Sequence, residues 1–128
     1  MGSKAQVSFE FFILVGMAFL VSLVFTALSL KDLNSFRIQN ENDAVKDLAL
    51  KLQQEAIIAA GVEDGYVRGF SIPDKLDSIN YSLLVQNSSL LIVQSKNGFY
   101  LVQIPRIVGN FTKGANKINK TNGVIYIN

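Results

Sequence analysis

Hydrophobic and polar positions divide the chain into three stretches with different patterns. Residues 11–30 are an apolar run without a single charged side chain. From Leu33 to Ala60, apolar residues recur every three or four positions, which is the period of a helix with one buried face. After Gly61, short runs rich in Val, Ile, Leu, Tyr and Phe alternate with turn residues, and this pattern predicts β-strands.

The apolar run at 11–30 has the length of a membrane-spanning helix. Its 20 residues would form a helix about 30 Å long, which matches the hydrocarbon core of a bilayer. Ser22, Thr26 and Ser29 are tolerable there, because a hydroxyl on a helix can bond a carbonyl one turn earlier. The first stretch is therefore predicted to lie in lipid or among other helices of the same kind.

The second stretch predicts an amphipathic continuation of this helix. Its apolar face carries Val45, Leu48, Leu52, Ala56 and Ala59. Between these positions fall Asp43, Lys46, Asp47, Lys51 and Glu55. Gly61 is a suitable C-terminal stop. No proline precedes Pro73, so one helix could run through both stretches, although the polar residues 34–43 could hold a bend or a restart.

The third stretch predicts strands at 66–72, 80–86, 90–95, 99–104 and 124–127, with a weaker one around 115–119. Asn97-Gly98 and Asn122-Gly123 are strong hairpin signals, and Asn87-Ser88 is a weaker one. Pro105 should lie at a strand end or an edge. We expect an α+β fold, in which a long N-terminal hydrophobic helix (about 6–60) packs by its outer half on a small antiparallel β-sheet meander.

Composition narrows the possible chemistry. The 128 residues include no Cys and no His, which excludes disulfides, thiolate metal sites and the commonest general base. All ten acids lie at or before Asp77, and only basic residues follow it: Lys96, Arg106, Lys113, Lys117 and Lys120. This basic third is interpreted as a solvated face, or as a surface complementary to another subunit or to an anionic surface.

No catalytic motif is found. The loop acids Glu63, Asp64, Asp74 and Asp77 lack the spacing of an EF-hand. Phosphate-binding loops, dinucleotide fingerprints and nucleophile elbows are also missing. Basic residues near Phe111 and Tyr126 lack a stacking motif for nucleic acid. We therefore expect a protein that is not an enzyme, uses no cofactor or metal and binds no nucleic acid.

The N-terminal residues carry a recognisable signature. The segment Gln6-Val-Ser8-Phe-Glu10-Phe-Phe-Ile-Leu14 fits the pattern Q-x-S-x-E-x-x-x-L. A short leader, MGSKA, precedes it and carries Lys4, which favours an N-terminus in the cytoplasm. Together with the apolar run, this resembles the class III signal peptide of archaeal type IV pilin-like proteins. Ala5 stands where Gly is commoner in that family, and the resemblance covers only about the first 30 residues.

The resemblance implies a subunit of a pilus-like filament for adhesion or attachment. A prepilin peptidase would cut between Ala5 and Gln6, and the other partners would be like subunits, an assembly ATPase and a membrane platform protein. The chain would then divide into a leader (1–5), a transmembrane or filament-core helix (6–30), an amphipathic continuation (31–61) and an extracellular β domain (62–128). It would lie in the cytoplasmic membrane before assembly and at the cell surface afterwards.

Glu10 would acquire a role under this interpretation. A carboxylate in hydrocarbon costs at least about 2.5 kcal/mol on insertion scales. Cleavage would create an α-amine on Gln6, and the resemblance implies that Glu10 pairs with the N-terminal amine of a neighbouring subunit. Alternatively, Glu10 lies at the headgroup level, where the dipole of the helix N-terminus favours an anion.

Four N-x-S/T sequons lie in the region predicted to be extracellular, at Asn80, Asn87, Asn110 and Asn119. They predict a glycoprotein, or else reflect a β domain rich in Asn and Ser.

Two other functions stay open. One is a single-span, membrane-anchored extracellular binding domain, and the other is a minor pilin or pseudopilin, neither of which forms a filament.

Overall fold

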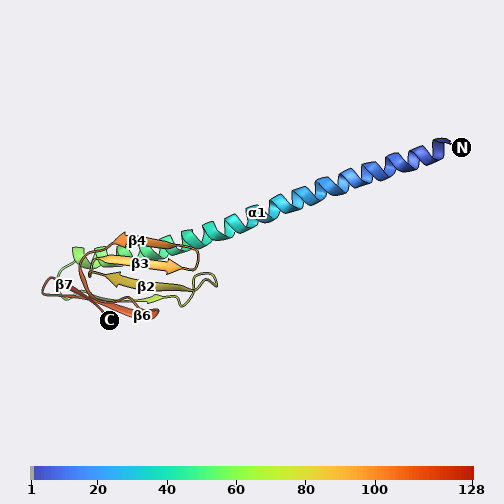
Figure 1. Cartoon of the computed structure of the whole chain (residues 1–128). Helices are drawn as coiled ribbons and strands as arrows, with labels where there is room; N and C mark the ends of the chain where they lie inside the picture. The colour runs from blue at the N-terminus through green and yellow to red at the C-terminus, as the bar shows by residue number, and fades with distance from the viewer. Residues whose placement is uncertain (1) are drawn as a thin grey trace. The chain divides into compact units, whose positions relative to one another are not determined.

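The computed structural model describes the backbone of residues 2–128 and the side chains of residues 7–128 (Figure 1). Within this range the chain contains one helix, α1 (Gly2–Gly61), followed by strands. These are β1 (Val67–Ile72), β2 (Tyr81–Gln86), β3 (Leu90–Ser95), β4 (Phe99–Gln103), β5 (Ile107–Gly109), β6 (Gly114–Thr121) and β7 (Val124–Ile127). The predicted α+β fold, with a long apolar N-terminal helix and a small antiparallel-rich β domain, is confirmed.

The chain divides into two units, Met1–Arg37 and Ile38–Asn128, which we describe separately. The helix assignment of α1 continues through residues 34–43, so the restart considered there does not occur. The chain has neither Pro nor Gly between Gly16 and Gly61, and these are the residues that most often break a helix. The second unit contains the remainder of α1 and all seven strands.

The part of α1 in the second unit buries the predicted apolar face. Val45, Leu48, Leu52, Ala56 and Ala59 are all buried, and Asp43, Lys46, Asp47 and Lys51 are exposed. Glu55 is the exception, because its residue is only 7% exposed. It lies one turn from Leu52 and from Ala59, and its carboxylate pairs with Arg68 of β1 at 3.1 Å. Unlike the other charged residues that fall between the apolar positions, Glu55 is therefore buried.

Gly61 ends α1 as predicted, and β6 supplies a cation to this end of the helix. The Lys120 ammonium donates hydrogen bonds to the carbonyls of Ala60 and Val62, both at 2.7 Å. The last turn of a helix leaves carbonyls without partners in the helix and carries a partial negative charge. Lys120 both donates hydrogen bonds to carbonyls at this end and brings a positive charge close to it. It thereby replaces a basic residue that the last turn of α1 lacks.

The strands form two sheets. β2, β3 and β4 make an antiparallel three-stranded sheet, whereas the other sheet has the order β1-β6-β7-β5. The predicted single meander is wrong here, because β1 pairs with β6 and the short strand β5, which the sequence did not predict, pairs with β7 in parallel. The other strands agree with prediction, and Pro105 lies just after β4, at a strand end.

The predicted turns join neighbouring strands. Asn87-Ser88 connects β2 to β3 and Asn122-Gly123 connects β6 to β7, with all four residues at positive φ. In Asn122-Gly123, which lies between the paired residues Thr121 and Val124, positive φ at both residues is the geometry of a two-residue turn that matches the twist of the strands, whereas Asn87-Ser88 belongs to a three-residue loop between Gln86 and Leu90. Asn97-Gly98 connects β3 to β4.

Both sheets and the second-unit part of α1 contribute to one hydrophobic core. The largest fully buried side chains come from the helix and five of the strands: Val45, Leu52, Ile72, Leu91, Val93, Ile107, Ile118 and Ile127. Burial of one such side chain stabilises a fold by about 1.5–3 kcal/mol. The second unit thus has its own core, whose buried side chains run from Val45 to Ile127.

Candidate functional site

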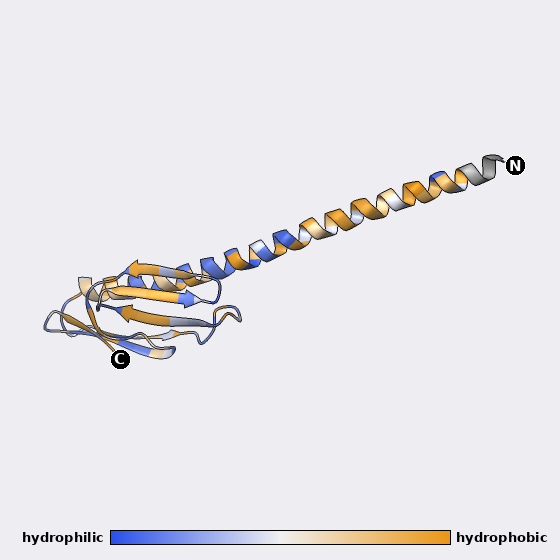
Figure 2. Cartoon of the chain, in the orientation of Figure 1, coloured by the Kyte–Doolittle hydropathy of each residue, from blue (hydrophilic) through white to orange (hydrophobic). Residues whose placement is uncertain are grey.

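The apolar segment of the first unit is uncovered on every side. Its large hydrophobic side chains from Val7 to Leu30 are all exposed, from 47% at Val15 to 72% at Phe12. Figure 2 shows this stretch of α1 as mostly hydrophobic. Within the described residues, α1 is the one helix long and apolar enough to cross a membrane. Apolar surface of this extent marks a site that another apolar phase or protein covers.

Two of the three hydroxyls in residues 11–30 are satisfied within the helix. Thr26 donates to the carbonyl of Ser22 at 2.8 Å, and Ser29 donates to that of Phe25 at 3.0 Å. These bonds agree with the expectation from the sequence. They remove the need for an outside partner, so the segment can enter an apolar environment without unsatisfied hydroxyls at these two positions.

The signature residues Ser8, Glu10 and Leu14 are exposed on helical backbone. Glu10 and Leu14 are four positions apart and therefore lie on the same side of α1. Glu10 is the one charged residue between positions 7 and 30. Lys4, Ala5 and Gln6 lie outside the described side chains, so the cleavage site stays a prediction.

The four sequons lie in different environments. Asn80 precedes β2, Asn87 lies in the β2–β3 turn and Asn110 follows β5, and all three are exposed. Asn119 is half-buried within β6, and its Oδ1 is buried with no hydrogen-bond partner among the described residues. In the third sequon, the Thr112 hydroxyl accepts a hydrogen bond from the Asn128 amide at 3.0 Å.

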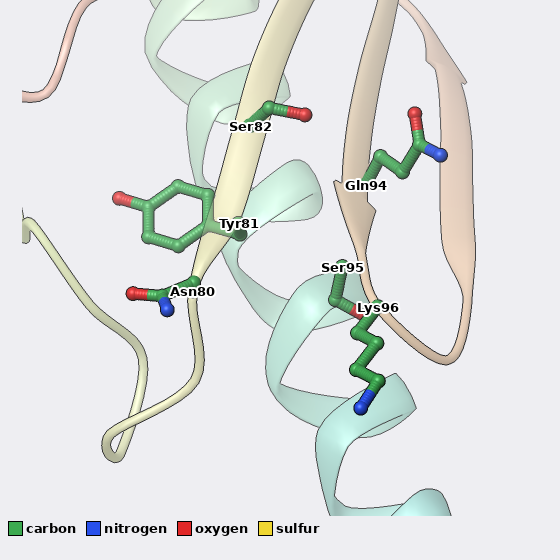
Figure 3. A pocket seen from close by; sticks show the side chains of 6 residues that line it. All are labelled: Asn80, Tyr81, Ser82, Gln94, Ser95 and Lys96. Carbon is green, nitrogen blue, oxygen red and sulfur yellow. The ribbon is translucent and has the colours of Figure 1, made fainter.

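A shallow hollow of about 400 Å³ lies at one end of β2 and β3 (Figure 3). Its lining consists of Asn80, Tyr81, Ser82, Gln94, Ser95 and Lys96. These side chains can donate and accept hydrogen bonds, but they include no carboxylate that could work as a general base.

Tyr81 anchors this end of the β domain. Its hydroxyl donates to the carbonyl of Pro73, and the Lys113 ammonium lies 4.5 Å from the centre of its ring. Burial raises the pKa of Tyr81, and the negative charge of Asp74 adds to this shift. Since Lys113 contacts Tyr81 and Lys120 holds the end of α1, at least two of the five residues of the predicted basic face have roles within the fold.

Glu41 is a buried acid that sequence patterns did not single out. The Asn97 amide donates to its Oε2 at 2.7 Å, and the Asn97 backbone N–H donates to its Oε1 at 3.4 Å. Hydrogen bonds from the Ser95 hydroxyl and then from Asn97 lower the pKa of Glu41. It precedes Val45 by one turn on the same side of α1, and this spacing is the signal that could have found it.

The turn that Glu41 holds also lies against the next residue of the helix. A Cβ added at Gly98 would lie 2.2 Å from Oδ1 of Asn42. Asn97-Gly98 therefore serves both as a hairpin turn and as a point of close contact with α1. Glu41 and Asn42 together fix the β3–β4 hairpin on the second-unit part of the helix.

Comparison with known proteins gives no relative for this chain. No protein-family model, no curated protein and no solved structure matches it.

Proposed function

We propose that this protein is the structural subunit of an archaeal type IV pilus-like filament that serves adhesion or attachment. The observation that carries the proposal is the apolar segment 11–30, which is exposed on every side of α1. It directly follows the Q-x-S-x-E-x-x-x-L signature of Gln6–Leu14. An apolar helix attached to a β domain with its own core is consistent with a pilin-like fold.

The segment would have two successive environments. It would first span the cytoplasmic membrane with its N-terminus inside, and would then bundle with the same segment of other copies in the filament core. Both environments are apolar, so the transfer does not expose the segment to water. Association of apolar helices then depends on close packing, for which small residues such as Gly16 and Ala18 are suited.

Glu10 would select the register of this bundle. After cleavage between Ala5 and Gln6, each subunit would begin with an α-amine, about one helical turn from its own Glu10. An amine and a carboxylate about 4 Å apart attract each other by about 4 kcal/mol at an effective dielectric constant of 20. Pairing with the amine of a neighbouring subunit would offset the insertion cost of at least about 2.5 kcal/mol and would thereby favour assembly.

The cellular partners follow from this route. A prepilin peptidase would remove the leader, and an assembly ATPase with a membrane platform protein would drive extraction of the subunit from the membrane. The β domain would face solvent outside the cell, where the sequons at Asn80, Asn87 and Asn110 would be accessible to glycosylation. Like subunits are then the main permanent partners.

The first test is the N-terminus of the mature protein. Mass spectrometry of protein from native membranes or from sheared surface fractions should show a chain that begins at Gln6. A mature chain that retains residues 1–5 would contradict processing by a prepilin peptidase and with it the proposal.

The second test is replacement of the acid. Glu10→Ala should leave membrane insertion intact while surface filaments disappear from electron micrographs. Asp32→Ala is the matched control, because it removes an exposed acid of the same helix outside the apolar segment. If the wild-type protein is processed but never appears in sheared fractions, the binding-domain or pseudopilin alternative is favoured instead.

A further inference from the structure

The three-stranded sheet has an outer face without charge. Side chains of β2, β3 and β4 alternate between a face packed on the core and a face directed away from it. The second set, which we call the outer sheet face, consists of Ser82, Leu84, Gln86, Leu90, Ile92, Gln94, Phe99, Leu101 and Gln103. Charged residues are missing from all three strands, and Figure 2 shows these strands as mainly hydrophobic.

Apolar side chains form the centre of the outer sheet face. Leu84 pairs with Ile92 across β2 and β3, and Ile92 pairs with Leu101 across β3 and β4. Phe99 lies two residues before Leu101 on the same side of β4. Leu84, Leu101 and Phe99 are 59%, 45% and 65% exposed. An apolar centre with a rim of Gln and Ser is the composition of a protein interface.

A second apolar surface lies on α1 just beyond the apolar segment. Leu33 and Phe36 are 58% and 62% exposed, and their spacing of three places them on the same side of the helix. Residues 11–30 already span the thickness of a bilayer, and Lys31 and Asp32 come directly after them. Lipid tails would therefore leave Leu33 and Phe36 uncovered in a simple membrane anchor.

We propose that the outer sheet face of one copy covers the Leu33–Phe36 surface of a second copy. This inference rests on the proposed function, because the second copy is brought close by bundling of residues 11–30. Leu33 and Phe36 begin less than one turn beyond that segment, so the contact continues the same interface along the same helix. The sheet face is suited to it because covering apolar side chains there desolvates no charge.

Two alternative partners fit the outer sheet face less well. The exposed side of α1 in the second unit carries four charges, Asp43, Lys46, Asp47 and Lys51, whereas two, Asp32 and Arg37, flank Leu33 and Phe36, so covering the second-unit side would desolvate more charge. Packing of the outer sheet face on itself would close into a dimer and leave Leu33 and Phe36 uncovered. A contact between two different surfaces of the same chain propagates from copy to copy, as a filament requires.

Cross-linking between single cysteines tests the contact, because the natural chain has no Cys. Cells should express full-length Phe36→Cys and Phe99→Cys chains together, and sheared filaments should be oxidised and separated on a non-reducing gel. We expect a dimer in which mass spectrometry finds the peptides of residues 36 and 99 joined. Co-expression of Phe36→Cys with Ile57→Cys is the control, since Ile57 is also apolar and 51% exposed but lies on α1.

Each outcome has a defined meaning. Three outcomes would overturn the inference and leave the proposed function standing. They are dimers from Phe99→Cys alone, equal cross-linking in the Ile57 control, and no dimer in intact filaments. Absence of filaments from cells with the wild-type chain would instead remove the proposed function and the inference with it.

A charge placed in the contact provides a second readout. Leu101→Glu should reduce the yield of filaments at least about tenfold. A tenfold change corresponds to a loss of about 1.4 kcal/mol of association free energy per contact. The side chain is nearly half exposed, so circular dichroism should show a folded β domain. Gln103→Glu, at the rim of the same face, should have a much smaller effect, and equal loss in both variants would contradict an apolar centre.

Discussion

At the scale of single residues, two buried acids fasten α1 to strands that follow it in the chain. Glu41 accepts hydrogen bonds from Asn97, and Glu55 pairs with Arg68. Acids are almost never buried unless they are paired, and the partners lie too far along the chain for a helical period to reveal them. These two positions are therefore where the sequence pattern was least informative about α1.

Loss of the Arg68 partner should destabilise the second unit. Arg68→Ala leaves the carboxylate of Glu55 buried without its cation, and its Oε2 already has no hydrogen-bond partner within the described part of the chain. Because Arg68 is about half exposed, we expect the free energy of unfolding to fall by only about 1–3 kcal/mol. Thermal unfolding of the full chain in detergent, followed by circular dichroism, measures this.

Two further variants separate the pair from other effects of the change. Lys117→Ala, on an exposed position of the same sheet, should change stability by no more than about 0.5 kcal/mol. The double variant Glu55→Gln/Arg68→Ala should be more stable than Arg68→Ala alone. If the double variant is less stable than Arg68→Ala, the unpaired charge of Glu55 is not the cause of the destabilisation.

Glu41 should make stability depend on acid pH. Its folded-state pKa is lowered from the ordinary value of 4.5, so its contribution is complete above that value. The contribution is lost as the pH falls below 4.5 through the folded-state pKa. The melting temperature of wild type should exceed that of Glu41→Gln at neutral pH, and the gap should narrow by about pH 3. A gap that stays constant over this range would contradict the assignment.

At the scale of elements, β5 can form because a glycine lets its backbone approach that of β7 closely. Gly109 has φ of +105°, and a Cβ at this position would lie 2.1 Å from the carbonyl oxygen of Ile127. Ile107–Gly109 pairs with Ile125–Ile127 in parallel at this point. A three-residue strand has too few positions to show an alternating pattern, which is why the sequence did not predict it.

Gly109→Ala should loosen this pairing. The added methyl group meets both unfavourable φ and a backbone oxygen, so we expect destabilisation of more than about 1 kcal/mol. Hydrogen exchange should show faster exchange of β5 and β7 amides. Gly65→Ala is the matched control, because Gly65 has φ of +93° but open space around it. Equal effects of the two substitutions would show that backbone strain, and not the contact with Ile127, is decisive.

The sequence predicted elements better than their pairing. The apolar period placed Val45 and Leu52 in the core, and the turn residues at Asn97 and Asn122 located two hairpins correctly. These signals are local. The partition into two sheets depends on β1 finding β6, about 45 residues later, and no local pattern encodes that choice. For the candidate site, the exposed apolar segment was predictable from residues 11–30, whereas the outer sheet face required the register of β2–β4.

At the scale of the whole molecule, the division into two units predicts that the second can exist without the first. Its core draws on Val45–Ala59 of α1 and on both sheets. A chain that begins at Ile38 should therefore be folded and monomeric at micromolar concentration without detergent, because residues 11–30 are removed. Circular dichroism and analytical ultracentrifugation check this. An unfolded or aggregated product would show that the first unit is needed for the fold.

The order of strands in the four-stranded sheet also bears on when the chain can fold. β1 opens the β domain, but its neighbour β6 and the next strand β7 follow β2, β3, β4 and β5 in the chain. The carbonyls at the end of α1 likewise wait for Lys120. Pairings between such distant segments form slowly. During synthesis the four-stranded sheet therefore stays open until residues 114–127 are available, and the β domain closes only when that segment pairs with β1 and reaches the end of α1.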